Sequence, residues 1–191
     1  VIATSLDTGG LRGVMFSFRD LLLTHRETLN LLNVYPVPDG DTGSNMAATL
    51  ESVIAELDEI SAESGLDVVA GAVAHGSLMG ARGNSGVLLS QVLRGLMGVL
   101  AGAGVVLDGR MVAGGMAAAS TAAYEAVGRP VEGTILTVVR EASEAAVEAA
   151  DAGVDLLAVA EAAREAGGRS LERTPELLPV LAEAGVVDAG G

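Results

Sequence analysis

The sequence contains no cysteine and no lysine among its 191 residues, and no tryptophan. Without cysteine the chain has no disulfide, no thiolate nucleophile and no thiolate metal site, which fits a reducing compartment. Without lysine, a phosphate site cannot use the lysine of a P-loop or of the protein kinase fold. Any bound phosphate must therefore be neutralised by metal ions, arginine or backbone N–H groups.

Aromatic residues are also scarce, at 2% of the chain, although 50% of the residues are hydrophobic. The core must then consist of Ala, Leu, Val, Met and Ile, a composition that favours helix over sheet. No linker or internal repeat divides the chain, so residues 1–191 are expected to form a single domain. Both ends read as those of a piece cut from a longer protein.

The formal net charge is -14 and the sequence pI about 4.3. This charge repels the phosphate backbone of DNA and RNA, so no nucleic-acid partner is expected. The most apolar stretch, residues 87–107, is interrupted by Gln91, Arg94 and glycines, which favours a buried helix over a membrane span. A cytoplasmic protein without an integral membrane segment is predicted.

Apolar residues recur at helical spacing along most of the chain, and Pro and Gly clusters separate the periodic segments. Short links between long helices favour antiparallel neighbours. The pattern predicts an all-α up-and-down barrel or bundle of about eight antiparallel helices, near 11–33, 44–61, 67–80, 85–101, 109–127, 134–151, 154–171 and 174–184.

The acidic turn Asp39-Gly40-Asp41 follows two stiffening prolines and precedes a predicted helix. Two carboxylates so close together repel each other unless a cation lies between them, and carboxylate oxygens are ligands that Mg²⁺ prefers. The alternative is an ordinary turn in which Asp41 or Ser44 caps the helix. The turn alone leaves both interpretations open.

A glycine-rich turn, residues 80–86, separates two helical segments. Its glycines permit close backbone approach, Ser85 offers a hydroxyl, and the next helix presents free N–H groups, which together outline a phosphate site. Arg82 supplies a positive charge, either for phosphate or for an exposed salt bridge. A plain helix-Gly-helix turn is the alternative.

Two further clusters complete the pattern, GRPVEGTIL at 128–136 and VDAGG at 187–191. The four motifs, in the order NVYPVPDGDTGSNM, GARGNSGVLLSQVLRG, RPVEGTILTVVREA and VDAGG, resemble the N-terminal kinase domain of the bacterial fatty acid kinase subunit FakA. That domain is related to DhaL, the nucleotide-binding subunit of dihydroxyacetone kinase. The resemblance extends from about Leu21 to the last residue.

The resemblance implies a DhaL-like barrel of eight antiparallel helices that binds ATP at one end with two Mg²⁺ ions. It implies that Asp39 and Asp41 are the catalytic metal ligands. Relatives of the dihydroxyacetone kinase type have a third Asp in this loop, whereas the nearest residue here is Asn33, one position out of register. The nucleotide-binding residues implied by the resemblance are Thr42, Gly43, Ser44, Asn45, Asn84, Ser85, Gly86, Arg129, Thr134, Asp188, Ala189 and Gly190.

By the same resemblance, the domain would transfer the γ-phosphate of ATP to a fatty acid on a separate FakB-like binding subunit, giving an acyl phosphate. The longer protein would dimerise through regions absent from this chain. Two alternatives stay open: transfer to a ketose such as dihydroxyacetone, and a non-catalytic nucleotide-binding helical module. His25 and His75 lie inside helical segments far from the motifs and are not expected to act as catalytic bases.

Overall fold

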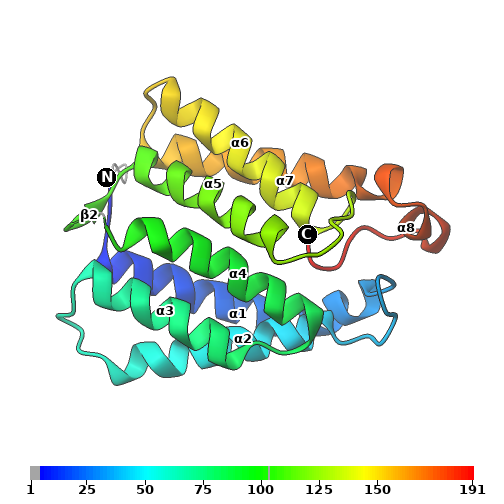
Figure 1. Ribbon diagram of the computed structural model, residues 1–191, viewed down its shortest axis with the longest axis horizontal. Coiled ribbons are helices and arrows are strands. Elements are labelled where there is room, and N and C mark those ends of the chain that lie inside the picture. The colour runs from blue at the N-terminus through cyan, green and yellow to red at the C-terminus, as the bar shows by residue number, and fades with distance from the viewer. Residues whose placement is uncertain (1–4, 103) are drawn as a thin grey trace.

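The computed structural model describes residues 5–102 and 104–191, which fold as a bundle of helices with one small β-ribbon (Figure 1). The helices of the described residues are α1 Thr8–Leu32, α2 Thr42–Glu59, α3 Leu66–Gly80, α4 Gly83–Leu100, α5 Gly109–Glu125, α6 Ile135–Asp151, α7 Leu156–Leu177 and α8 Pro179–Ala184. The two strands, β1 Leu6–Asp7 and β2 Val106–Leu107, pair antiparallel with Leu6 opposite Leu107. The predicted all-α bundle is confirmed.

Each helix packs against the next one in the chain, as the short connections predicted. Two hydrophobic cores result. The larger core lies among α1 to α4 and is built from Leu, Val and Met side chains, whereas the smaller one, among α5 to α7, consists mainly of alanines. The two halves appear as two layers in Figure 1 and meet where α4 packs against α5.

The α4–α5 contact depends on small residues. A Cβ placed on Gly95 of α4 would lie 2.6 Å from the carbonyl oxygen of Ala118 in α5, closer than real Cβ atoms approach. Glycine at this position therefore lets two helix backbones touch. Gly115 of α5 likewise leaves room for the Leu96 and Leu100 side chains of α4.

The up-and-down order sends the odd-to-even connections to one end of the bundle. The α1–α2, α3–α4, α5–α6 and α7–α8 connections lie at the end opposite the β1–β2 ribbon, where the C-terminus also lies (Figure 1). The motifs singled out in the sequence are three of these connections and the C-terminal segment. The topology thus gathers segments that are far apart in the chain.

The end of α7 corrects the sequence prediction. A break was expected between 171 and 174, but the helix continues through Pro175 to Leu177, and α8 is only six residues long. Proline lacks an N–H group, which leaves the carbonyl of Leu171 without its usual helical partner. The hydroxyl of Thr174 donates to that carbonyl at 2.8 Å, so the helix absorbs the proline.

Two tertiary features were not foreseen. The guanidinium of Arg12 in α1 donates to the carbonyls of Leu57, Ile60 and Ser61 at the end of α2, which satisfies groups that a helix end leaves unpaired. The β-ribbon is too short for its alternation to be visible in the sequence.

Within the described residues, no helix is both long enough and apolar enough to cross a membrane.

Candidate functional site

A cavity of about 560 Å³ opens at the end of the bundle where the odd-to-even connections meet. This volume lies in the range of pockets that hold small molecules. Segments of all four sequence motifs form its wall. The predicted site residues that line it are Asn33, Asp39, Asp41, Thr42, Asn84, Ser85, Arg129, Thr134, Asp188, Ala189 and Gly190.

The acidic turn forms one side of the cavity. Asp39 is exposed and Asp41 half-buried, and both line the cavity together with the buried Asn33. The side-chain amide of Asn33 donates a hydrogen bond to Oδ1 of Asp39 at 2.8 Å. Asn33 therefore orients the Asp39 carboxylate, which leaves its own amide oxygen as the atom that can face a cation.

The Asp41 side chain does not cap α2, contrary to one form of the capping alternative. Asp41 occupies the position before α2, but its side chain makes no capping hydrogen bond. Ser44 is held instead by Asn30 of α1, whose amide accepts from the Ser44 N–H and donates to its hydroxyl, each at 3.0 Å. The Asp41 carboxylate is thus not used as a helix cap and faces the cavity.

The donor atoms on this side of the cavity fit a hard cation such as Mg²⁺. They are all oxygens, two of them from carboxylates and one from an amide. Residues 5–102 and 104–191 contain no group of three or more His, Cys, Asp or Glu side chains arranged to hold a metal. A cation here would share its coordination with water and ligand oxygens, as Mg²⁺ does when it binds phosphates.

The N-termini of α2 and α4 both open toward the cavity, which Thr42, Asn84 and Ser85 line. The residues before the two helices, Asp41 and Arg82, make no side-chain capping bond. Asn30 takes the Ser44 N–H of α2, and the N–H groups before it, with those at the start of α4, are available for an anion. The hydroxyl of Ser85 is buried and lacks a hydrogen-bond partner. A buried donor without a partner is costly, so a ligand oxygen within reach of this hydroxyl would be favoured.

Several predicted residues lie behind the cavity wall instead of on it. Gly43 packs against Leu29 and the backbone of Arg26 in α1, and Gly86 packs against Thr49 of α2. Asn45 contacts Gly83, whose backbone has φ +56°, a conformation that favours glycine. Gly43, Ser44, Asn45 and Gly86 therefore fix how α1, α2 and α4 meet and are not among the lining residues.

The charge of the cavity is unbalanced. Its lining includes three carboxylates, from Asp39, Asp41 and Asp188, and among the described lining residues Arg129 is the only cation. Arg82, the other candidate, donates to the carbonyls of Ala81 and Met79 at the end of α3 and does not line the cavity. An anionic ligand would be repelled by this set unless a cation entered with it.

Asp188 is only 8% exposed and is bound into the C-terminal segment. Burial raises the pKa of its carboxyl to about 6, although hydrogen bonds from the N–H groups of Gly190, Ile135 and Gly191 act to lower it. Its carboxylate therefore occupies the N-terminus of α6, where Thr134 also caps the first turn. The open helix ends of the cavity are those of α2 and α4.

The sequence did not identify the apolar side of the cavity. Leu88, Val127, Val131, Ile135 and Leu136 line it together with the segment before the acidic turn, which contains a cis peptide bond between Tyr35 and Pro36. Their apolar character gave no sign that they face a cavity and not the core. Asn30 was also missed, because an exposed-looking amide in a long helix carries no signal of its partner fourteen residues away.

Thr174 of α7 holds the C-terminal segment that lines the cavity. Its buried hydroxyl donates to the Leu171 carbonyl and accepts the N–H of Asp188 at 3.0 Å.

Thr174→Val keeps the shape but leaves both backbone groups unpaired, so the free energy of unfolding should fall by about 2 kcal/mol. Urea unfolding measures the change. Thr121→Val, at an exposed threonine of α5 with a comparable helical bond, serves as the control and should differ little from the wild type.

The fold and cavity define an all-helical domain that presents an oxygen-rich cation site beside two open helix N-termini. The DAK2 domain family model matches residues 36–191. The chain therefore belongs to the DAK2 domain family, a kinase-related family of nucleotide-binding modules that includes the dihydroxyacetone kinase type. The expected relation to DhaL-like domains is confirmed at this level.

The chain is also similar to several bacterial proteins. It is 44% identical over 170 residues to protein YloV of Bacillus subtilis, a match that covers 89% of this chain and 30% of that protein. An uncharacterized protein of Staphylococcus saprophyticus is 44% identical over the same shares of each chain. One from Staphylococcus aureus is 43% identical, over 89% of this chain and 31% of that protein. The chain thus spans about a third of the length of these relatives.

Proposed function

We propose that this domain binds ATP together with Mg²⁺ and is the phosphoryl-donating part of a fatty acid kinase. The observation that carries the proposal is the shared cavity, which brings the acidic turn and the open N-termini of α2 and α4 together. The acidic turn suits the metal ion, and the open helix N-termini suit the phosphates of the nucleotide. Membership in a kinase-related family supports the same reading.

The phosphates would lie against the first turns of α2 and α4. Backbone N–H groups there, the side chain of Asn84 and the hydroxyl of Ser85 would donate to phosphate oxygens. Arg129 would add the one positive side chain on this wall. Because the chain has no lysine, these groups replace the lysine used by other nucleotide-binding folds.

Asp39, Asp41 and Asn33 would hold the magnesium. When bound, Mg²⁺ would neutralise the phosphate oxygens and offset the charge of the carboxylates. The resemblance to DhaL-like domains implies two such ions. Catalysis of this kind relies on positioning and charge stabilisation and requires no protein nucleophile.

The apolar side of the cavity would receive the base. Val127, Val131 and Leu136 offer apolar side chains to the cavity, which Ala189 and Gly190 also line. Placing the base there leaves the phosphates on the side with free N–H groups and oxygen ligands. The cavity is thereby divided into an apolar part and a charged part, as nucleotide sites commonly are.

The acceptor follows from the resemblance to the fatty acid kinase branch, which the PDGDTG and RGNSG segments carry. A carboxylate oxygen of the fatty acid would attack the γ-phosphorus, the bond to the bridging oxygen of ADP would break, and an acyl phosphate would form. The acid would be presented by a separate FakB-like subunit in the cytoplasm, and the full-length protein would be a homodimer. The alternative acceptor is dihydroxyacetone.

Isothermal titration calorimetry with ATP, in the presence and absence of Mg²⁺, tests the nucleotide half of this proposal. Binding that depends on the metal is expected, and its absence would contradict the proposal. The acceptor is tested with the full-length protein and a fatty-acid-loaded partner subunit, by product analysis for an acyl phosphate. Phosphorylated dihydroxyacetone in the parallel reaction would overturn the fatty acid assignment while leaving the nucleotide site in place.

A further inference from the structure

The connection between α5 and α6, residues 126–134, carries Arg129 and Thr134 on the cavity wall. Its C-terminal half is restrained at two points. Pro130 follows Arg129 directly, and the hydroxyl of Thr134 donates to the carbonyl of Val131 at 2.7 Å. Because Pro130 restricts the backbone of Arg129, a group that holds residues 131–134 limits the positions that Arg129 can take.

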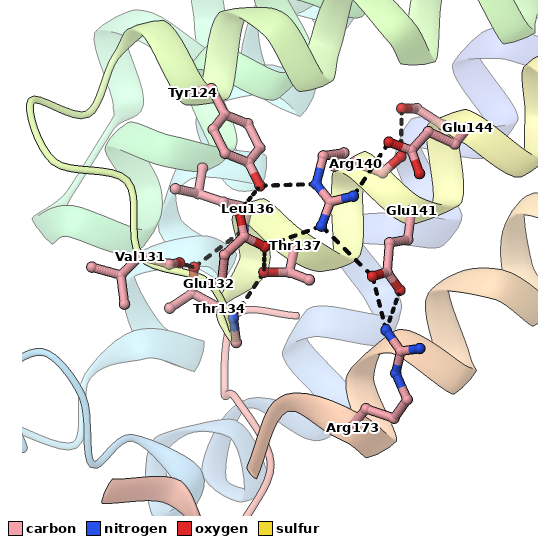
Figure 2. A network of polar contacts seen from close by, with 12 residues as sticks. Tyr124, Val131, Glu132, Thr134, Leu136, Thr137, Arg140, Glu141, Glu144 and Arg173 are labelled. Atoms are coloured by element: carbon pink, nitrogen blue, oxygen red, sulfur yellow. Dashed lines mark hydrogen bonds and ion pairs between the residues drawn. The ribbon is translucent and has the colours of Figure 1, made fainter. Parts of the chain in front are cut away.

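Glu132 is the fixed point (Figure 2). Its carboxylate accepts hydrogen bonds from the hydroxyl of Thr137 at 2.7 Å, the hydroxyl of Tyr124 at 2.9 Å and the guanidinium of Arg140 at 3.1 Å. Thr137 in turn accepts the N–H of Gly133 at 2.8 Å. The connection is thus bound to the end of α5 and to the first turns of α6.

The network continues to α7. Nε of Arg140 donates to the Tyr124 hydroxyl at 3.2 Å, and a second nitrogen of Arg140 lies 3.6 Å from Glu141. Glu141 accepts two bonds from Arg173 of α7, at 2.8 and 2.9 Å (Figure 2). Burial raises the pKa of the Glu132 carboxyl, but bonds from Thr137, Tyr124 and Arg140 outweigh it and hold that pKa below its ordinary value.

Part of the network stabilises the fold, because the buried hydroxyl of Thr137 joins Glu132 to the Gly133 N–H. The ion pair of Glu132 with Arg140 adds less, since their side chains are 49% and 36% exposed. What the network does define is the path of the connection between two points on the cavity wall. The contacts therefore suit a role in geometry.

We propose that Glu132, held by Tyr124 and Arg140, is a positioning residue that sets Arg129 against the phosphates of the bound nucleotide. This inference rests on the proposed function, because it assumes that the cavity binds ATP with Mg²⁺. Glu132 would not touch the nucleotide itself. Its effect on binding would pass entirely through the connection that carries Arg129.

A double-mutant cycle tests the proposal by calorimetric titration of each variant with ATP and Mg²⁺. Glu132→Gln should weaken binding about tenfold in the wild-type background and have almost no further effect beside Arg129→Met, because the two residues act through one contact. Tyr124→Phe removes one hydroxyl without a change of charge and should weaken binding about threefold. Equal losses in both Arg129 backgrounds, or no loss with Glu132→Gln, would overturn the proposal.

The matched control is Glu165→Gln, which removes a carboxylate that is paired only at 3.8 and 3.9 Å on the exposed side of α7, and it should leave binding unchanged. A second measurement does not depend on nucleotide. Hydrogen exchange of the ligand-free protein should show faster exchange of the amides of residues 128–134 in Glu132→Gln and normal exchange in Glu165→Gln. Unchanged exchange in Glu132→Gln would overturn the proposal. A wild-type chain that binds no ATP would instead contradict the proposed function.

Discussion

Asp41→Ala is expected to abolish magnesium-dependent binding of ATP while leaving the helix content unchanged. The Asp41 carboxylate makes no capping bond to α2, so its removal takes away a cation ligand and no contact that the helix needs. Loss of residues that merely orient metal ligands lowers metal affinity by about 10- to 100-fold, and loss of a ligand should exceed about 100-fold. Calorimetry measures the binding and circular dichroism the helix content.

Asp39→Ala should give a comparable loss of binding, with a small added effect on folding because the Asn33 amide loses its acceptor. Asp58→Ala is the matched control, since it removes an exposed carboxylate near the other end of α2. Normal binding by either Asp39→Ala or Asp41→Ala would show that the ligand assignment is wrong. A loss that is the same with and without Mg²⁺ would show that the carboxylates do not act through a cation.

Asp188→Asn is expected to make the ligand-free domain more stable at neutral pH. Burial raises the pKa of Asp188 from 3.8 to about 6, so the folded state binds the proton more tightly than the unfolded state does. Stability from this group is therefore fully present below pH 3.8 and is lost as the pH rises through 6. The asparagine variant avoids that loss and should be more stable above pH 6 by up to about 3 kcal/mol.

Urea unfolding between pH 4 and 8 measures this difference. The curves of Asp188→Asn and the wild type should converge near pH 4 and separate as the pH rises, whereas Asp58→Asn should follow the wild type throughout. Parallel curves over the whole range would mean that Asp188 keeps an ordinary pKa. A site that retains a costly carboxylate is expected to use it, so nucleotide binding should weaken in the stabilised variant.

The sequence predicts the helices well because their apolar residues recur with a strong helical period and glycine or proline stands at most of the connections. It fails at α7, where Pro175 signals a break but Thr174 supplies the missing hydrogen bond from the side chain. That compensation depends on one rotamer of one residue. Local patterns of residue type do not encode it.

In the candidate site, too, some features can be predicted from the sequence and others cannot. The acidic turn and the glycine-rich turn are visible as motifs because their residue types are unusual in combination. The residue pattern by itself does not show that Arg129 and not Arg82 lines the cavity, because that depends on where each connection points after the bundle has folded; only the resemblance favoured Arg129. Asn30 and Glu132 were missed for the same reason, since their partners are set by packing between helices.

The alternation of the helices also gives the molecule two unequal ends. The even-to-odd connections, described at residues 61–65, 101–102, 104–108 and 152–155, lie at the end away from the cavity, and none of these described residues lines it. The turns at 61–65 and 152–155 are largely exposed, so changes of length there need mainly preserve the closing of a turn, whereas 104–108 holds the buried Leu107 of the β-ribbon. Labels, inserted tags and fused domains therefore belong at these two turns, where the chain can be extended without reshaping the surface that meets a ligand.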